Sequence, residues 1–313
     1  MLLVFVAASY YMPPSSSISY VVGDPEISGN SASITYPPDY QGLAQYALDL
    51  INQDRATLGY HALVLSPIDS GEQHADSMLY FGYFSHWDPQ GLKPYMRYSA
   101  LNGTGSVFEN VAWQHSQDPG YTSLADIKSA LFRMNFQMMY DDSYSNWEHR
   151  ANILNPDHDR VSIGVAYGSQ DVFFVEDFED NSVNLTAPLT LLGSQVNLTA
   201  TLASPLSDGF LQVYYDPLAS VDVGSLRNDP RYTGSYDPGT LVGVVLPTPS
   251  TPYLSPAGAL TLYALSWQQG PSSLQVVFSL EALTQKCGKG VYTVYLQLLT
   301  GQQLLGSSLF YGG

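Results

Sequence analysis

Three residues have side chains that could bind a metal ion or move a proton: His86, Glu109 and His149. They lie in the segments FSHWDP (84–89), FENVA (108–112) and WEHRANIL (147–154). Neutral imidazoles suit zinc, and a carboxylate near a bound water can accept its proton. Taken singly, each has a plainer interpretation. A histidine between aromatic residues is more often a packed core residue, and Glu109 could simply cap a turn.

Several sharper catalytic motifs are absent from the sequence. There is no Gly-x-Ser-x-Gly elbow, no His-Glu-x-x-His helix, no phosphate loop and no complete dinucleotide fingerprint. The single cysteine, Cys287, excludes an internal disulfide and a cysteine-based metal cluster. Any metal site must therefore be built from histidines and carboxylates.

Composition excludes whole classes of partner. The chain has 313 residues, enough for about two domains, and 45% of them are apolar, enough for a buried core. Eleven Lys and Arg stand against 28 Asp and Glu, which gives a net charge of −17. This charge argues against nucleic acids and anionic membrane surfaces as partners. Only 12% of residues are charged, and 24 are Tyr, a balance that favours an extracellular protein.

The first 38 residues are predicted to lie outside the globular part. The start, LLVFVAAS (2–9), resembles the later part of a secretory signal, although no basic residues precede it. The alternative is an ordinary buried strand. The Pro-, Gly- and Ser-rich stretch that follows predicts an exposed tether. No other uncharged apolar run reaches the roughly 18 residues of a membrane span.

Residues 39–181 predict a compact α+β domain. Apolar spacing predicts helices over 43–58, 66–79 with Ser66 as N-cap, and 123–140, and the run 161–178 predicts a hairpin. From 188 to 313 the pattern changes to about seven short strands separated by Gly, Pro, Asp and Ser. This predicts an antiparallel β-sandwich of the immunoglobulin-like kind. Glycosylation acceptor tripeptides begin at Asn102, Asn184 and Asn197.

Seven short segments of the first domain occur in an order known from one family. They are LINQDRA (50–56), HADSM (74–78), FSH (84–86) with Pro89 and Arg97, ENVA (109–112), HRANIL (149–154), IGV (163–165) and VFFVEDF (172–178). Residues 40–180 thus resemble the CAP superfamily (cysteine-rich secretory proteins, antigen 5 and pathogenesis-related proteins), or SCP domain, in its cysteine-poor prokaryotic form.

The resemblance implies an α-β-α sandwich in a secreted protein, with a central cleft lined by two histidines and two glutamates. The histidines of the family often bind a divalent cation, commonly zinc. By position, His86 matches the first histidine, Glu109 the first glutamate and His149 the second histidine. Two protein nitrogens would leave coordination positions open for water or substrate, with Glu109 as the base that accepts the proton.

The second family glutamate has no counterpart here. It should lie on the helix before the second histidine, but 132–140 contains no acid. Asp142 and Glu148 are the candidates to replace it, and a solvated loop acid is the plainer interpretation of both. His74 fits a packing position of the family, and His158, between two aspartates, reads as part of a surface turn.

Two functions from different classes follow, and enzymatic activity stays open. The first is metal-assisted hydrolysis, with a bound water as nucleophile and Glu109 as base. The alternative is a non-catalytic extracellular binding module for a lipid or sterol, a glycan, or a protein or peptide. Aromatic residues crowd 80–98 and could either floor such a site or pack the core. A third possibility is an inert spacer in a secreted or cell-surface protein.

Overall fold

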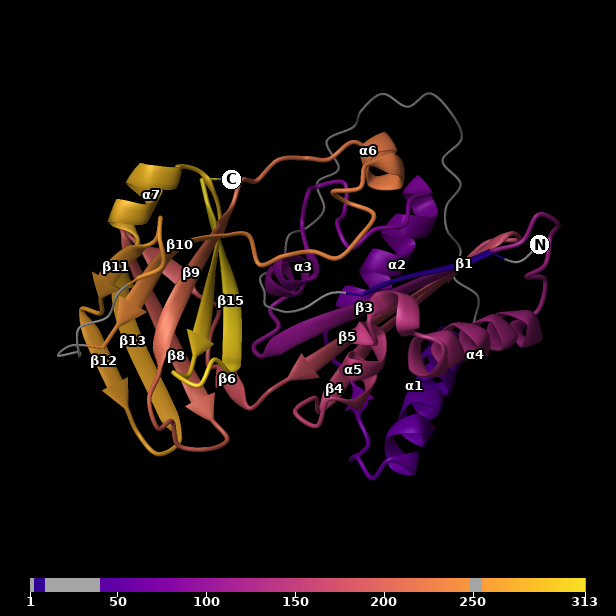
Figure 1. Ribbon diagram of the computed structural model, residues 1–313, viewed down its shortest axis with the longest axis horizontal. Coiled ribbons are helices and arrows are strands. Elements are labelled where there is room, and N and C mark those ends of the chain that lie inside the picture. The colour runs from indigo at the N-terminus through magenta and orange to yellow at the C-terminus, as the bar shows by residue number, and fades with distance from the viewer. Residues whose placement is uncertain (1–2, 9–39, 248–254, 313) are drawn as a thin grey trace.

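The computed structural model describes residues 3–8, 40–247 and 255–312 (Figure 1). Strand β1 (Leu3–Ala8) pairs antiparallel with β3 (Ser106–His115), in register from Leu3 with His115 to Ala8 with Asn110. The strand that was the alternative to a signal segment is therefore present, whereas the signal itself stays a prediction. The predicted tether lies outside the described residues.

The three predicted helices are present as α1 (Tyr40–Thr57), α2 (Ser70–Phe81) and α4 (Leu124–Tyr140). Ser123 caps α4 through a capping box with Asp126. The predicted start of α2 at Ser66 is wrong. The backbone N–H of Ser66 donates to Val161 and so extends the sheet pairing, and the helix begins four residues later.

The first sheet has the strand order β1-β3-β5-β4-β2, in which β2 is Val64–Leu65. The predicted hairpin is confirmed as β4 (Arg160–Tyr167) and β5 (Asp171–Asp180). Helices α2 and α3 (Pro94–Ala100) cover one face of this sheet, and α1, α4 and α5 (Glu148–Leu154) cover the other (Figure 1). The 3-10 turn η1 (Ser143–Ser145) precedes α5. These layers are the expected α-β-α sandwich.

The C-terminal part has two sheets that share one apolar core. One follows the order β11-β10-β9-β14-β15, and the other β12-β13-β8-β6 with β7 also on β8. Their bounds are β6 (Val183–Leu185), β7 (Thr190–Leu192), β8 (Gln195–Leu202), β9 (Phe210–Asp216), β10 (Thr240–Leu246), β11 (Leu260–Tyr263), β12 (Ser266–Gln269), β13 (Ser273–Ser279), β14 (Gly290–Gln297) and β15 (Gln303–Tyr311), with α7 (Glu281–Cys287) between β13 and β14.

One detail of this part differs from the sequence prediction. The pair β10/β11 is parallel, so the part is not wholly antiparallel. Strand β6, which lies between the predicted domains 39–181 and 188–313, pairs with β8 of the second sheet. The immunoglobulin-like arrangement itself stays a prediction.

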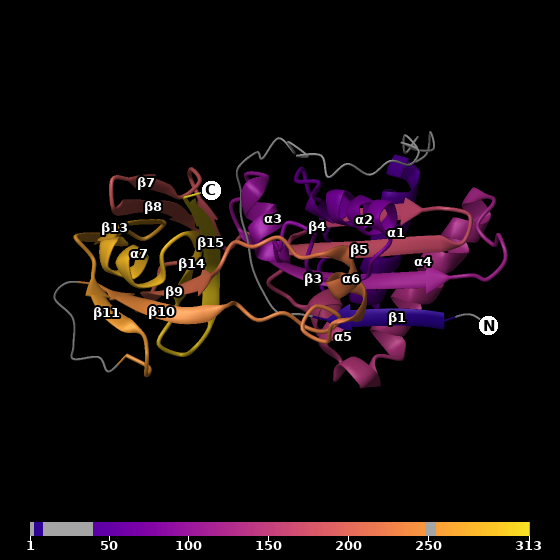
Figure 2. The ribbon, with the colours of Figure 1, turned by 90° about the horizontal axis from the view of Figure 1, so that it is seen from above.

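One long connection of the C-terminal part lies against the first domain. Residues 217–239, which join β9 to β10 and contain α6 (Val223–Asn228), are here called the 217–239 segment. Figures 1 and 2 show α6 over the first sheet rather than among the strands that flank it in sequence. Leu226 and Tyr236 of this segment are buried in the first domain's core. The two parts therefore share hydrophobic packing.

A buried ion pair also joins the two parts. Lys93 Nζ, at the start of α3, lies 2.8 Å from Asp216 Oδ1 and 3.1 Å from Asp237 Oδ1. The hydroxyl of Tyr95 donates to Asp216 Oδ2 at 2.9 Å. Because the Lys93 side chain is only 6% exposed, this contact fixes the 217–239 segment and the end of β9 against α3.

Candidate functional site

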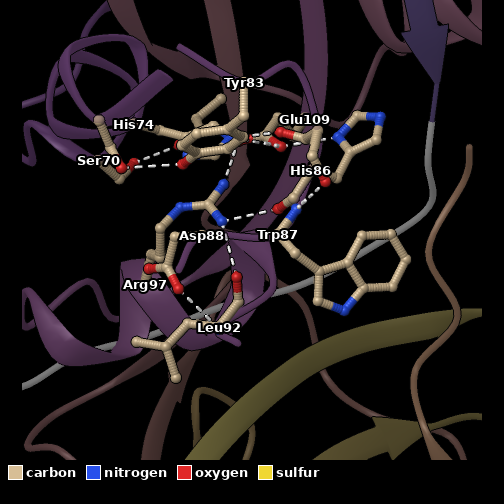
Figure 3. Close-up of polar contacts among 12 residues, drawn as sticks. Ser70, His74, Tyr83, His86, Trp87, Asp88, Leu92, Arg97 and Glu109 are labelled. Carbon is tan, nitrogen blue, oxygen red and sulfur yellow. Dashed lines mark hydrogen bonds and ion pairs between the residues drawn. The ribbon is translucent and has the colours of Figure 1, made fainter. Parts of the chain in front are cut away.

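The candidate residues His86 and Glu109 are in contact, and the Arg97 guanidinium holds the Glu109 carboxylate (Figure 3). His86 Nδ1 lies 2.7 Å from Glu109 Oε1. Arg97 of α3 donates from Nη2 to Glu109 Oε2 at 2.5 Å and from Nη1 to the carbonyl of His86 at 2.7 Å. All three side chains are buried. Arg97 thus fixes both the acid and the loop that carries the histidine.

A second carboxyl group completes this cluster. Asp177 of β5 is the direct cross-strand partner of Glu109, and their side chains are hydrogen-bonded. Ser70 Oγ donates to Asp177 Oδ2 at 2.5 Å. Burial raises the pKa of Glu109 to about 7 although the Arg97 charge opposes it. Burial and the neighbouring Glu109 charge raise the pKa of Asp177 well above its usual range. Both shifts favour the protonated forms of these carboxyl groups, and the Arg97 guanidinium is the cation beside them.

The 217–239 segment covers His86. The ring of Tyr236 lies 5.2 Å from the His86 ring and 5.9 Å from that of Tyr95. Trp87 contacts the same tyrosine at 6.2 Å. His86 and Glu109 are 0% exposed and Tyr236 is 5% exposed. The first histidine of the predicted cleft is therefore closed off from solvent.

His149 belongs to a different cluster. Its Nδ1 lies 2.5 Å from Asp142 Oδ1, and the backbone N–H of Arg150 donates to Asp142 Oδ2 at 3.2 Å. Burial raises the pKa of Asp142, but hydrogen bonds from His149 and Ser145 outweigh it and hold the pKa below its usual range. Asp142 is thus the buried partner of His149 and not a solvated loop acid. Glu148, the other candidate, is half-buried at the first residue of α5.

Asn110 ties the second cluster to the sheet. Its Nδ2 donates to Glu176 Oε2 at 3.0 Å and to the carbonyl of His149 at 3.2 Å. Its Oδ1 accepts from Asn152 Nδ2 at 2.8 Å. Burial raises the pKa of Glu176 to about 8, which keeps this carboxyl group protonated near neutral pH.

The two clusters lie on opposite faces of the sheet. Glu109 and Asn110 are successive residues of β3, and successive side chains of a strand point to opposite faces. The His86 cluster therefore lies between the sheet and helices α2 and α3. The His149 cluster lies on the opposite face of the sheet, beside α5. Both histidines do bond a carboxylate through Nδ1, and metal-binding imidazoles are commonly held by a carboxylate in the same way. Within the described parts of the chain, however, no three His, Cys, Asp or Glu side chains are grouped to hold an ion. The shared cation stays a prediction.

Sequence reasoning assigned no role to Arg97, Asp177 and Tyr236. The first two lie in segments that carry the family resemblance, and the hairpin pattern could have paired Asp177 with a neighbouring strand. Tyr236 lies outside the matched region and carries no local signal. His74 is buried as expected, with Nε2 2.8 Å from the carbonyl of Ser85. The surface prediction for His158 is wrong, because it is 0% exposed, and burial lowers its pKa to about 3.

An open pocket lies beside the His86 cluster, between the first domain and the 217–239 segment. Its cavity volume is about 870 Å³, within the range typical of small-molecule sites. The first domain contributes mostly aromatic side chains, and the segment contributes polar ones. The lining comprises Leu79, Gly82, Tyr83, Phe84, Trp113, His115, Asp171, Phe173, Arg227, Asn228 and Thr233. Of the aromatic run predicted at 80–98, Tyr83 and Phe84 line this pocket, whereas Tyr95 and Tyr98 are core residues.

The three glycosylation candidates differ in accessibility. Asn102 is exposed in a turn with a φ of 65° and Asn197 is exposed on β8. Asn184 is half-buried, and its Nδ2 donates to the carbonyl of Asn181 at 2.7 Å. A glycan at Asn184 would break this bond, so Asn102 and Asn197 are the more accessible acceptors.

Comparison with known proteins finds one family in the first domain. Residues 48–178 match the CAP family, described as the cysteine-rich secretory protein family. A solved structure, the CAP domain of Enterococcal PrgA, is similar at 14% identity and a TM-score of 0.35, over 50% of this chain and 68% of that one. No curated protein matches the sequence at a significant level. Among the described residues, no helix has the length and apolar character to cross a membrane. The first domain of the chain, over residues 48–178, is thus a CAP domain.

Proposed function

We propose that this protein is a non-catalytic extracellular binding module whose ligand occupies the 870 Å³ pocket between the CAP domain and the 217–239 segment. The observation that carries the proposal is a contrast in access. The pocket is hollow and lined by several partly exposed side chains, whereas His86, Glu109 and His149 are all 0% exposed. A ligand can therefore reach the pocket without rearrangement of the fold, but it cannot reach the two buried histidines.

The chemistry of the buried clusters also supports binding over hydrolysis. A general base must be free to take a proton from water within hydrogen-bond reach. The carboxylate oxygens of Glu109 are instead engaged with Arg97, His86 and Asp177. Metal-assisted hydrolysis at His86 and His149 remains the competing function, and it would require both clusters to open toward one cation.

We also propose that the protein is secreted or attached to the cell surface. The CAP domain, the low charge content and the apolar start of the chain support a secreted or cell-surface location. We place glycans at the exposed Asn102 and Asn197 under this proposal. The C-terminal sheets, as an immunoglobulin-like sandwich, would position the CAP domain and supply one wall of its pocket.

The test compares the pocket with the buried histidines in the full chain. The apolar dye 8-anilinonaphthalene-1-sulfonate should bind the wild type, and a Thr233→Trp variant, which fills the pocket from its exposed rim, should lose this binding. A His86→Ala/His149→Ala variant should bind zinc no differently from wild type by calorimetry. Glu109→Ala should leave rates on ester and peptide panels unchanged.

The competing function predicts the reverse. One equivalent of zinc bound by wild type and lost in the double histidine variant would establish a metal site. An ester or peptide hydrolysis rate that falls in Glu109→Ala would establish catalysis. Either result would overturn the proposal of a non-catalytic module.

A further inference from the structure

Aromatic side chains of the first domain line one side of the pocket, here called the aromatic floor. Trp113 of β3 and Phe173 of β5 are direct cross-strand partners. Their ring planes are parallel within 3°, with centroids 5.9 Å apart, but Phe173 is only 3% exposed. Phe84 lies beside Trp113, with ring centroids 6.1 Å apart and planes inclined by 36°. Trp113 and Phe84, both partly exposed, are therefore the rings that a ligand can contact, and holding Trp113 on the sheet before a ligand arrives lowers the entropy cost of binding.

Polar groups fix this floor and border it. Asp171 Oδ1 accepts from Trp113 Nε1 at 2.8 Å and lies 2.9 Å from His115 Nδ1. The side chain of Asp171 is 32% exposed and that of His115 is 36% exposed. Both bonds reach the same carboxylate oxygen, Oδ1. The indole is thus held in place beside a hydrogen-bond acceptor.

The opposite wall comes from the 217–239 segment. Arg227 donates from Nε to the carbonyl of Gly82 and from Nη2 to that of Phe81, which anchors α6 at the end of α2. Asn228 and Thr233, both exposed, stand beside it. The wall therefore offers amide, hydroxyl and guanidinium groups opposite the aromatic floor.

Resting on the proposed function, we infer that the ligand is an uncharged carbohydrate built from β-linked gluco-configured pyranose rings. Such a ring has flat C–H faces that stack on aromatic side chains and an edge of hydroxyl groups for Asp171, Asn228 and Thr233. Leu79 is the one aliphatic side chain in the lining, whereas an acyl chain fits an aliphatic tunnel. The Asp171 carboxylate and the Arg227 guanidinium balance in charge, which favours a neutral ligand over an ionic one.

The test measures binding of cellotriose and chitotriose to the full chain by calorimetry and saturation-transfer NMR, with laurate as the lipid probe. At least one sugar should bind the wild type. Trp113→Ala should weaken its binding at least tenfold, since truncated tryptophans dominate such losses. Asp171→Asn, which keeps the size of the side chain, should weaken it severalfold. Phe136→Ala, which removes an aromatic ring 47% exposed on α4 outside the pocket, is the matched control.

The outcomes separate the two proposals. If laurate binds and Thr233→Trp abolishes it while neither sugar binds, the carbohydrate inference is overturned and the binding module stands. If sugar binding survives both Trp113→Ala and Asp171→Asn unchanged, the inference is also wrong. If the dye, the sugars and laurate all fail to bind the wild type, the proposed function fails as well.

Discussion

Tyr236 lies with its ring 5.2 Å from the imidazole of His86, although 150 residues separate the two in sequence. The tyrosine belongs to the connection between β9 and β10, and the histidine to the CAP domain. Where the family resemblance implies an open cleft, this contact makes the histidine part of a hydrophobic core that includes Trp87 and Tyr95. The C-terminal part therefore decides the accessibility of a residue in the first domain.

Removal of this tyrosine should open the cluster. Tyr236→Ala deletes a 5% exposed ring and is expected to lower the free energy of unfolding by roughly 3–5 kcal/mol, the range for large aromatic truncations in cores. His86 should then react with diethylpyrocarbonate, as mapped by mass spectrometry. Tyr263→Ala, at a ring that is 55% exposed, is the control and should change neither quantity. Unchanged His86 reactivity in Tyr236→Ala would show that other groups close the site.

The Arg97–Glu109 pair should behave as a structural pair. Glu109→Gln leaves the buried guanidinium short of one counter-charge and should cost roughly 3 kcal/mol of unfolding free energy. Arg97→Met should cost a similar amount by leaving the carboxylate unpaired. The double variant should lose less than the sum, with a coupling above about 1 kcal/mol in a urea-unfolding cycle. If the losses of unfolding free energy in the two single variants simply add up in the double variant, Arg97 and Glu109 do not act as a pair.

Stability should fall as pH rises through the titration of Glu176. The folded protein holds this proton up to a pKa of about 8, whereas the unfolded chain releases it near pH 4.3. Between these values the folded state binds more protons, so the carboxyl group's stabilising contribution is complete at low pH and is lost by about pH 8. Glu176→Gln mimics the protonated acid and should remove up to about 4 kcal/mol of this dependence.

The measurement is the difference in Tm between pH 5 and pH 8 for wild type and Glu176→Gln. Glu109 and Asp177 also have raised pKa values. Their titration should therefore lower the stability of both the wild type and the variant as pH rises. Glu148→Gln, at a half-buried position, is the control and should follow the wild type. Equal slopes for wild type and Glu176→Gln would mean that Glu176 is ionised throughout.

Lys93 should couple unfolding of the two parts. Lys93→Met removes the ammonium that bridges Asp216 and Asp237 and should cost roughly 3 kcal/mol, because it leaves the mostly buried Asp216 without its cation. We expect calorimetry to show a second transition as the 217–239 segment loosens. Asp237→Asn alters a carboxylate that is 79% exposed and should cost less than about 1 kcal/mol. A single unshifted transition in Lys93→Met would rule out this role.

The sequence alone was sufficient for the elements with strong local signals. The stripe of α1, the helix over 123–140 and the hairpin β4–β5 follow from helical period and strand alternation. The ordered segments from 50 to 178 also indicated the CAP domain and singled out His86 and Glu109, because these residues match fixed positions of that family.

Only the tertiary structure decided how these residues are used. Glu109 and Asn110 are neighbours in sequence, yet the pleat of β3 sends them to opposite faces, so the two histidines join separate clusters. Asp142 looked like a loop acid and is buried on His149. Tyr236 covers His86 through a contact between distant segments, and no local pattern encodes such a contact. The sequence determined which residues carry chemistry, and long-range packing determined which of them solvent and ligands can reach.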